Sequence, residues 1–142
     1  MARRVLLVGC VLLAGLMLPV AAQPVGVARG QALFESRCVA CHSLDANRVG
    51  PALRTVVGRT AGKAPDYVYS EAMAAATHTW NREKLTAWLT NPETVVPGQA
   101  MNYRLDLPQD RDDVVAYLAS LASVASLAIP MTTAPAVAKP IR

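Results

Sequence analysis

Cysteine and histidine are scarce in this chain of 142 residues, which has three cysteines and two histidines. Cys10 lies in an N-terminal apolar stretch, so the rest of the chain holds only Cys38, Cys41, His42 and His78. A structural zinc site needs four protein ligands and would have to recruit all of these residues, including the distant His78. Strand-like runs are also missing, so we expect neither a zinc domain nor a fold built on a sheet.

A basic surplus is missing from the middle of the chain, although the formal charge of the whole is +4. Without Arg3 and Arg4 the charge is +2, and without Lys139 and Arg142 as well it is zero. Domains that bind nucleic acid carry a basic patch or stripe. We therefore expect no nucleic-acid partner.

The N-terminus has the layout of a secretory signal. Residues 1–22 contain two arginines, then an apolar run, a proline and small residues. We expect cleavage after Ala22 and a periplasmic protein. The alternative is an uncleaved membrane anchor, since residues 5–22 just reach the minimum length for spanning a bilayer.

The C-terminal residues 126–142 are rich in alanine, proline and threonine and show no periodicity. Such a composition is typical of a loose tail. Residues 23–125 remain as one domain of common size.

The cysteines and one histidine form a single motif, Cys38-Val-Ala-Cys41-His42. C-x-x-C-H is the attachment signature of c-type haem. The two thiols add to the two vinyl groups of haem, and the turn between them places the next residue under the iron, where imidazole is a strong axial ligand. The motif predicts one covalent haem c, with His42 bound to its iron.

Three other interpretations of the cysteine pair are weaker. A redox dithiol usually lies near a βαβ pattern, which this sequence lacks. Half a zinc site would need two further ligands. A disulfide across two intervening residues would close a tight, strained loop. Covalent haem also suits an exported protein, because thioether bonds keep the cofactor attached in a dilute compartment.

The opposite face of the iron either has a second axial ligand from elsewhere in the chain or is an open site. The candidates are Met73, His78, Met101 and Met131. Met131 lies in the tail, and His78 is expected to be a surface loop residue. Met73 follows Ser70, a helix N-cap, in a short helical stretch where a core methionine fits well.

Met101 is the strongest of these candidates. Pro92, Pro97 and Gly98 precede it and impose an extended, turning loop. A loop of this kind can hold a thioether against iron without a helix face. We therefore predict that His42 and Met101 are the two metal ligands.

The chain resembles class I c-type cytochromes, close to the mitochondrial cytochrome c and bacterial cytochrome c2 types. The matching segments are Gly30-Gln-Ala-Leu-Phe-Glu-Ser-Arg-Cys, Cys38-Val-Ala-Cys-His, Val49-Gly-Pro-Ala-Leu, Val57-Gly-Arg-Thr-Ala-Gly, Tyr69-Ser-Glu-Ala-Met, Thr79-Trp, Leu89-Thr-Asn-Pro, Val96-Pro-Gly-Gln-Ala-Met and Val115-Ala-Tyr-Leu. They follow one another in order over nearly the whole predicted domain. The resemblance implies an all-α cytochrome c fold wrapped around one haem.

Apolar residues at helical spacing independently predict three helices. They are Gly30, Phe34 and Cys38 in the first, Leu85, Trp88 and Leu89 in the second, and Val114, Val115, Leu118, Leu121 and Ala122 in the third. Asn81 is expected to cap the second helix, which ends before Pro92, and Asp110 suits the start of the third. In the family the first and last helices cross, and Gly30 would let them approach closely near Phe34 and Tyr117. Because only 5% of the residues are aromatic, the haem would supply much of the core.

The resemblance implies further cofactor contacts. The carbonyl of Pro51 would accept a hydrogen bond from His42 and orient its ring. Arg59, Tyr69 and Trp80 match positions that contact the haem propionates. Gln99 stands where a propionate-binding threonine is expected.

Two departures from the family pattern fall beside the methionine ligand. Trp88 replaces a tyrosine that usually hydrogen-bonds the sulfur, and Met73 replaces a buried asparagine. Both changes would make this side of the haem drier. A drier site disfavours the more highly charged ferric state, so we expect a raised reduction potential.

A further departure concerns the lysines that surround the exposed haem edge in relatives. Arg37 keeps one such position, whereas Glu93, Thr94 and Ala100 replace lysines. Charged rims steer docking on oppositely charged partners. We therefore expect electron transfer to depend weakly on salt.

With both axial positions filled, the expected function is one-electron transfer and not catalysis. The expected partners are redox proteins such as a bc1-type complex, a terminal oxidase, a reaction centre or a dehydrogenase, and the chain is expected to be a monomer. The alternative is a haem enzyme or gas sensor in which Met101 dissociates. Such sites need a distal polar group, and Met73, Trp88 and Tyr103 offer no acid–base pair.

Overall fold

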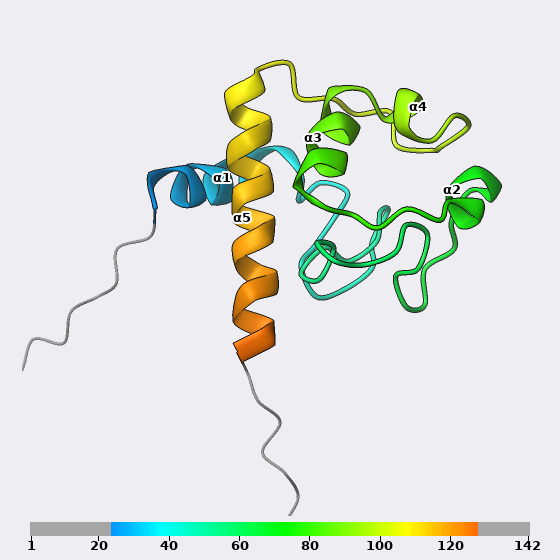
Figure 1. Cartoon of the computed structure of the whole chain (residues 1–142), viewed down its shortest axis with the longest axis horizontal. Helices are drawn as coiled ribbons and strands as arrows, with labels where there is room; N and C mark the ends of the chain where they lie inside the picture. Colours follow the sequence, from blue (N-terminus) through cyan, green and yellow to red (C-terminus); the bar gives the residue numbers. More distant parts are fainter. Residues whose placement is uncertain (1–23, 128–142) are drawn as a thin grey trace, which may run out of the picture.

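The computed structural model describes residues 24–127, which form short helices joined by long loops (Figure 1). The helices are α1 (Val25–Arg37), α2 (Glu71–Ala75), α3 (Arg82–Thr90), α4 (Pro92–Val95) and α5 (Pro108–Leu127). Within this range the β-type pairing is limited to one isolated antiparallel bridge, between Thr60 and Thr79. The prediction of an all-α fold is confirmed.

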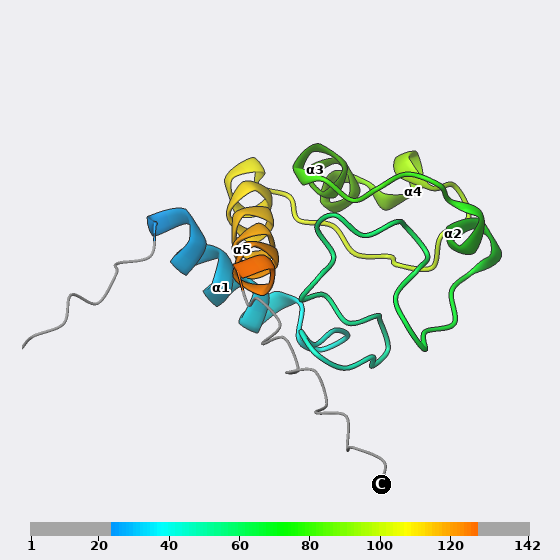
Figure 2. The ribbon, with the colours of Figure 1, turned by 60° about the horizontal axis from the view of Figure 1, so that its bottom comes forward.

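The first and last helices cross and form the largest helix contact (Figures 1 and 2). A Cβ atom at Gly30 would lie 1.9 Å from the carbonyl oxygen of Asp113 and 3.0 Å from Cβ of Tyr117. Only glycine therefore allows this approach. Next to it the rings of Phe34 and Tyr117 meet with centroids 5.6 Å apart, as the resemblance implied.

A buried carboxylate also lies at this crossing. Asp113 is buried, and burying a charge is costly unless it is paired. Arg29 of α1 forms an ion pair with it, and the Gln109 side chain donates a hydrogen bond to it at 3.0 Å. The two helices are thus joined by charge as well as by apolar contact.

Side-chain caps set the start of the two middle helices. The Asn81 side chain accepts the N–H of Lys84 at 2.8 Å at the start of α3, and Ser70 accepts the N–H of Met73 at 3.4 Å at the start of α2. The helix α3 buries Leu85, Trp88 and Leu89. These boundaries confirm the two caps expected from the sequence.

The long segment between α1 and α2 is held by backbone hydrogen bonds to itself and to the segment before α3. Gly50 donates to the carbonyl of Cys41 at 2.8 Å, and Leu53 donates to Ser43 at 3.0 Å. Further on, Gly58 donates to Trp80 at 2.8 Å, and Trp80 donates to Arg59 at 2.9 Å. The loops are therefore fixed without a sheet.

Both predicted terminal segments fall largely outside the described residues. The predicted signal at residues 1–22 lies outside entirely, as do residues 128–142 of the predicted tail. The helix α5 continues to Leu127, two residues past the expected end of the domain. Within residues 24–127 no helix combines the length and apolar character needed to cross a bilayer.

Candidate functional site

A cavity of about 550 Å³ lies between the helices and the loops, within the size range of cofactor pockets. Its walls are mostly apolar, and α1, α2, α3 and α5 each contribute, through Phe34, Met73, Trp88 and Leu118. The segments between the helices add Cys38, Cys41, His42, Pro51, Arg59, Tyr69, Trp80 and Met101. The fold thus brings every predicted site residue except Gln99 to one cavity.

The His42 side of the cavity, made of His42, Gly50 and Pro51, is tightly constrained. The His42 Nδ1 atom donates a hydrogen bond to the carbonyl of Pro51 at 2.8 Å. A Cβ atom at Gly50 would lie 2.2 Å from Cε1 of His42, so only glycine leaves room for the ring. With Nδ1 carrying the hydrogen, Nε2 is the atom left to bind a metal.

Burial controls the protonation of His42. Desolvation lowers the pKa of His42, and the hydrogen bond to Pro51 offsets this in part. The ring is therefore neutral at pH 7. Neutral imidazole is the form that coordinates a metal.

Cys38 and Cys41 lie on the turn that the motif requires. The N–H groups of Cys41 and His42 both donate to the carbonyl of Cys38, at 3.1 and 2.9 Å. Burial, with a further contribution from Cys41, raises the pKa of Cys38 to about 11. Reactive dithiols have a lowered thiol pKa, so the geometry does not favour the redox-dithiol interpretation.

The Met101 side of the cavity is made of Met73, Trp88 and Met101. It is largely apolar but includes one hydrogen-bond donor, the indole N–H of Trp88. Met73 and Trp88 are each 7% exposed. The indole Nε1 of Trp88 donates to the sulfur of Met101 at 3.3 Å. The expected loss of the tyrosine hydrogen bond is therefore made good by tryptophan, which the sequence reasoning did not anticipate.

The polar end of the cavity is formed by Arg59, Tyr69 and Trp80. The Nη2 atom of Arg59 donates to the carbonyl of Ala52 at 3.0 Å, whereas its buried Nε atom has no hydrogen-bond partner among the described residues. Desolvation lowers the pKa of Arg59. A buried donor of this kind fits an anionic ligand group, and the haem carboxylates supply one.

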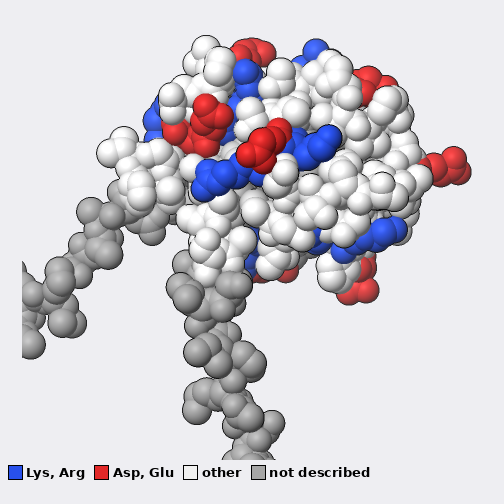
Figure 3. Space-filling model, in the orientation of Figure 1, with Lys and Arg blue, Asp and Glu red and all other residues white. Residues whose placement is uncertain are grey.

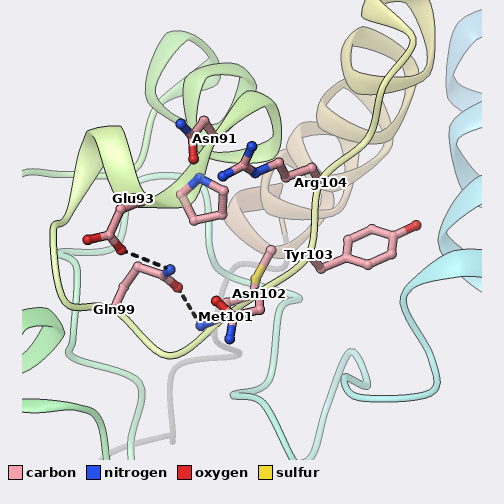
Figure 4. Close-up of a pocket in the computed structure, with 8 residues that line it drawn as sticks. Asn91, Glu93, Gln99, Met101, Asn102, Tyr103 and Arg104 are labelled. Atoms are coloured by element: carbon pink, nitrogen blue, oxygen red, sulfur yellow. Dashed lines mark hydrogen bonds between the residues drawn. The ribbon is translucent and has the colours of Figure 1, made fainter.

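Gln99 does not line the cavity, contrary to the expected propionate contact. It lies in a separate open cleft of about 570 Å³ outside the Met101 loop, together with Glu93 and Arg104 (Figure 4). Its side-chain amide donates to Glu93 at 3.4 Å, and its side-chain carbonyl accepts the N–H of Met101. The longer side chain, together with the carboxylate that α4 supplies, draws it outward.

His78 lies in a loop, as expected, but its ring is less exposed than a surface position implies. It is only partly exposed, and its ring meets that of Trp80 edge-on at 4.5 Å between centroids. Its Nε2 atom is buried without a hydrogen-bond partner among residues 24–127. Desolvation, with a smaller effect of Lys84, lowers the pKa of His78.

Two residues that shape the site were not predicted to be site residues. Gly50 makes room for His42, and Glu93 holds Gln99. The glycine directly before Pro51 is a signal that could have found the first. Nothing in the sequence indicates the second, because it depends on how α4 meets the loop.

Comparison with known proteins places this arrangement in one family. The family model for cytochrome c matches residues 27–122, which include every residue of the cavity described above. The chain belongs to the cytochrome c family. Members of this family hold one covalently attached haem c with its iron, and they are electron-transfer proteins, not enzymes. This protein is accordingly a monohaem electron carrier that works with redox-protein partners.

Several members of the cytochrome c family show the extent of the similarity. Cytochrome c of Euglena viridis is 44% identical over 96 residues, which are 66% of this chain and 94% of that protein. Cytochrome c2 of Agrobacterium tumefaciens (strain II Chrys) is 40% identical over 104 residues, 68% of this chain and 93% of that protein. The solved structure of cytochrome cH from Methylobacterium extorquens is 38% identical, with a TM-score of 0.63, and covers 66% of this chain and 97% of its own.

Proposed function

We propose that this cytochrome carries single electrons in an extracytoplasmic respiratory or photosynthetic chain, with His42 and Met101 as the axial ligands. One observation carries the assignment of the ligands. Met101 lines the same apolar cavity as Cys38, Cys41 and His42, although it lies in a distant segment of the chain. When bound, the haem iron supplies a one-electron couple in which no bond of the protein is made or broken.

The predicted site residues that line the cavity each have a defined task in this proposal. Cys38 and Cys41 attach the haem as thioethers, and Pro51 fixes the tautomer and the orientation of His42. Trp88 directs the sulfur of Met101 by its N–H group. The remaining polar groups, Arg59, Tyr69 and Trp80, hold the propionates.

The chemistry of the walls supports electron transfer over catalysis at the iron. Ligand-activating haem sites use distal hydrogen-bond donors or acid–base groups. Within the described part of the chain no carboxylate lines the cavity. Trp88 already donates to the sulfur, so its N–H is not free to serve a bound ligand.

The edge of the cavity is where we place partner docking. Val49 and Val68 line it and are 75% and 92% exposed. On the face drawn in Figure 3, acidic and basic side chains are interleaved and do not gather by sign. The proposed partners, for example a bc1-type complex, a terminal oxidase, a reaction centre or a dehydrogenase, would then dock mainly through apolar contact.

The proposed organisation places the carrier in the periplasm. Residues 1–22 act as a cleaved signal, residues 23–125 as the cytochrome domain, and residues 126–142 as a tail, with α5 extending the domain to Leu127. The folded domain acts as a monomer. Relatives named cytochrome c2 in bacteria support a carrier of this kind.

A redox-dependent visible spectrum with a mass, both taken on protein from the exported fraction, tests these points together. We expect covalent haem and, in the oxidised form, the weak far-red absorption band of sulfur ligation. The measured mass should be that of a haem-bearing chain whose first residue is Gln23. Pigment freed by acid–acetone, or a missing far-red band, would contradict the ligand assignment. Prompt binding of carbon monoxide to the reduced protein would favour an open-site function.

A further inference from the structure

A chain of hydrogen bonds on the outer face of the Met101 loop ends on the backbone of Met101 itself. The Glu93 carboxylate accepts the N–H of Gly98 at 2.9 Å and the side-chain amide of Gln99 at 3.4 Å. The side-chain carbonyl of Gln99 then accepts the N–H of Met101 (Figure 4). We refer to Glu93 and Gln99 with these bonds as the loop clamp.

Little else holds this part of the loop. The turn before it is closed by the Gln99 N–H on the carbonyl of Val96 at 3.2 Å, and the chain is next tied down where Leu105 donates to Leu89 at 2.9 Å. Between these points, no backbone group of residues 100–104 bonds another backbone group of the described chain. Where backbone groups have no backbone partners, hydrogen bonds from side chains must hold the loop in place.

The clamp and the indole hold Met101 from two directions. Gln99 fixes the backbone N–H of Met101 from the open cleft, and Trp88 donates to the sulfur at 3.3 Å from the cavity. In Figure 4 the Met101 side chain points away from Glu93 and Gln99, so the clamp acts on the backbone alone. Both clamp residues depart from the family pattern, in which a lysine and a threonine occupy these positions.

We infer that Glu93 and Gln99 are positioning residues that keep the Met101 sulfur at the iron and so hold the sixth coordination position closed to small external ligands. This inference rests on the proposed role of Met101 as an axial ligand. Entry of imidazole would break the iron–sulfur bond and form an iron–nitrogen bond, with no electron transferred. Loosening the clamp raises the fraction of time in which the position is open.

The test compares Glu93→Ala, Gln99→Ala and the double variant with the wild type, using the haem-loaded protein. Glu83→Gln is the matched control, because it removes one carboxylate charge from the first turn of α3 and leaves the loop untouched. The rate of imidazole binding to the oxidised protein, the far-red band, and hydrogen exchange of the Gly98 and Met101 amides are measured. Each single variant breaks the connection from Glu93 through Gln99 to the Met101 N–H, so each should bind imidazole roughly fivefold faster, the effect of about one net hydrogen bond.

The double variant separates a connected clamp from two independent contacts. Because Glu93 acts on Met101 through Gln99, the effects of the two single variants on imidazole binding should add only in part, the bond from Gly98 to Glu93 being the contribution that Gln99 does not share. Exchange at the Met101 amide should also rise in Glu93→Ala, although Glu93 does not touch that group.

The possible failures are distinct. If the wild type lacks the far-red band, the assignment of Met101 fails and the proposed function fails with it. If the wild type has the band but imidazole binds all variants at the control rate, the inference about the clamp is wrong. A lower midpoint of unfolding with unchanged imidazole binding would show a merely structural role. Glu93→Gln, which keeps an oxygen for Gly98, serves if an alanine variant does not fold.

Discussion

The His42 side and the Met101 side of the cavity are built by different means. On the His42 side, backbone atoms do the work, since Pro51 orients the ring and the bare Cα of Gly50 leaves space for it. On the Met101 side, the contacts to Met101 itself come from the side chains of Trp88 and Gln99, with Glu93 holding Gln99. Backbone contacts withstand most substitutions, whereas side-chain contacts can be exchanged one at a time. The first side can therefore fix the haem while the second is adjusted to set its properties.

The largest effect on stability should come from the substitution Gly50→Ala on the His42 side. The new Cβ atom would lie 2.2 Å from Cε1 of His42, so either the ring or the loop must move. We expect a loss of about 3 kcal/mol in the free energy of unfolding, at the upper end for overpacking. Denaturant unfolding of the haem-loaded protein measures it.

Gly58→Ala is the control for that substitution. Gly58 has a φ of +88°, and nothing lies within 4 Å of the position that an added methyl group would take. The substitution should lower the free energy of unfolding by about 1 kcal/mol through backbone strain alone. The visible spectrum of the haem, which reports its ligation by His42, should stay unchanged. Equal losses for the two variants would mean that the close fit around His42 has no energetic importance.

The second-largest effect is expected on the Met101 side, from the substitution Trp88→Phe. This change removes the N–H donor to the sulfur but keeps a buried ring. Hydrogen bonds to a sulfur ligand withdraw electron density and favour the reduced iron. Losing about 1 kcal/mol of such an interaction should lower the reduction potential by about 40 mV. An unchanged potential with intact folding would show that the bond has no influence on the iron.

Met73→Asn should act in the same direction but less strongly. Met73 is buried on the Met101 side, and an amide there makes the surroundings of the iron more polar. A more polar site favours the more highly charged ferric state, so the potential should fall. Electrochemical titration measures the change, and a potential that stays the same or rises would refute the idea of a dry Met101 side.

The smallest expected effect is the change of the electron-transfer rate with salt, which depends on the charges around the exposed edge of the haem. Glu93, Thr94 and Ala100 stand where relatives have lysines, so little charge of one sign is present to attract a partner. The rate of electron transfer to a partner complex should change by less than the roughly tenfold that marks electrostatic steering when salt is raised. Stopped-flow measurements from low to high salt decide this, and a steep loss of rate would contradict it.

Sequence reasoning was most accurate where the interaction is local in the chain. The C-x-x-C-H turn, the caps at Ser70 and Asn81, and the end of α3 before Pro92 depend on neighbours within a few residues, and the structure reproduces them. The extended loop expected from Pro92 onward is wrong for its first part, because Pro92–Val95 form α4, in which the proline takes a first-turn position. The contact of His42 with Pro51 followed from the family resemblance, which carries longer-range information.

Side chains whose direction depends on tertiary neighbours could not be predicted in the same way. Gln99 was expected to face the haem, but it turns outward because α4 brings Glu93 within reach. The bond from Trp88 to Met101 depends on where the indole nitrogen lies once α3 has packed. His78 was expected at the surface, yet the pairing of Thr79 with Thr60 draws it against Trp80.

The crossing of α1 and α5 has a consequence for the order of events in assembly. The residues for covalent attachment follow α1 directly, whereas Val114 and Leu118 of α5 close the cavity from the other end of the chain. A chain made from its N-terminus therefore presents both thiols before α5, which closes the cavity, has been made. The haem can be joined to the unfolded chain, and α5 then packs across α1 at the close approach that Gly30 allows.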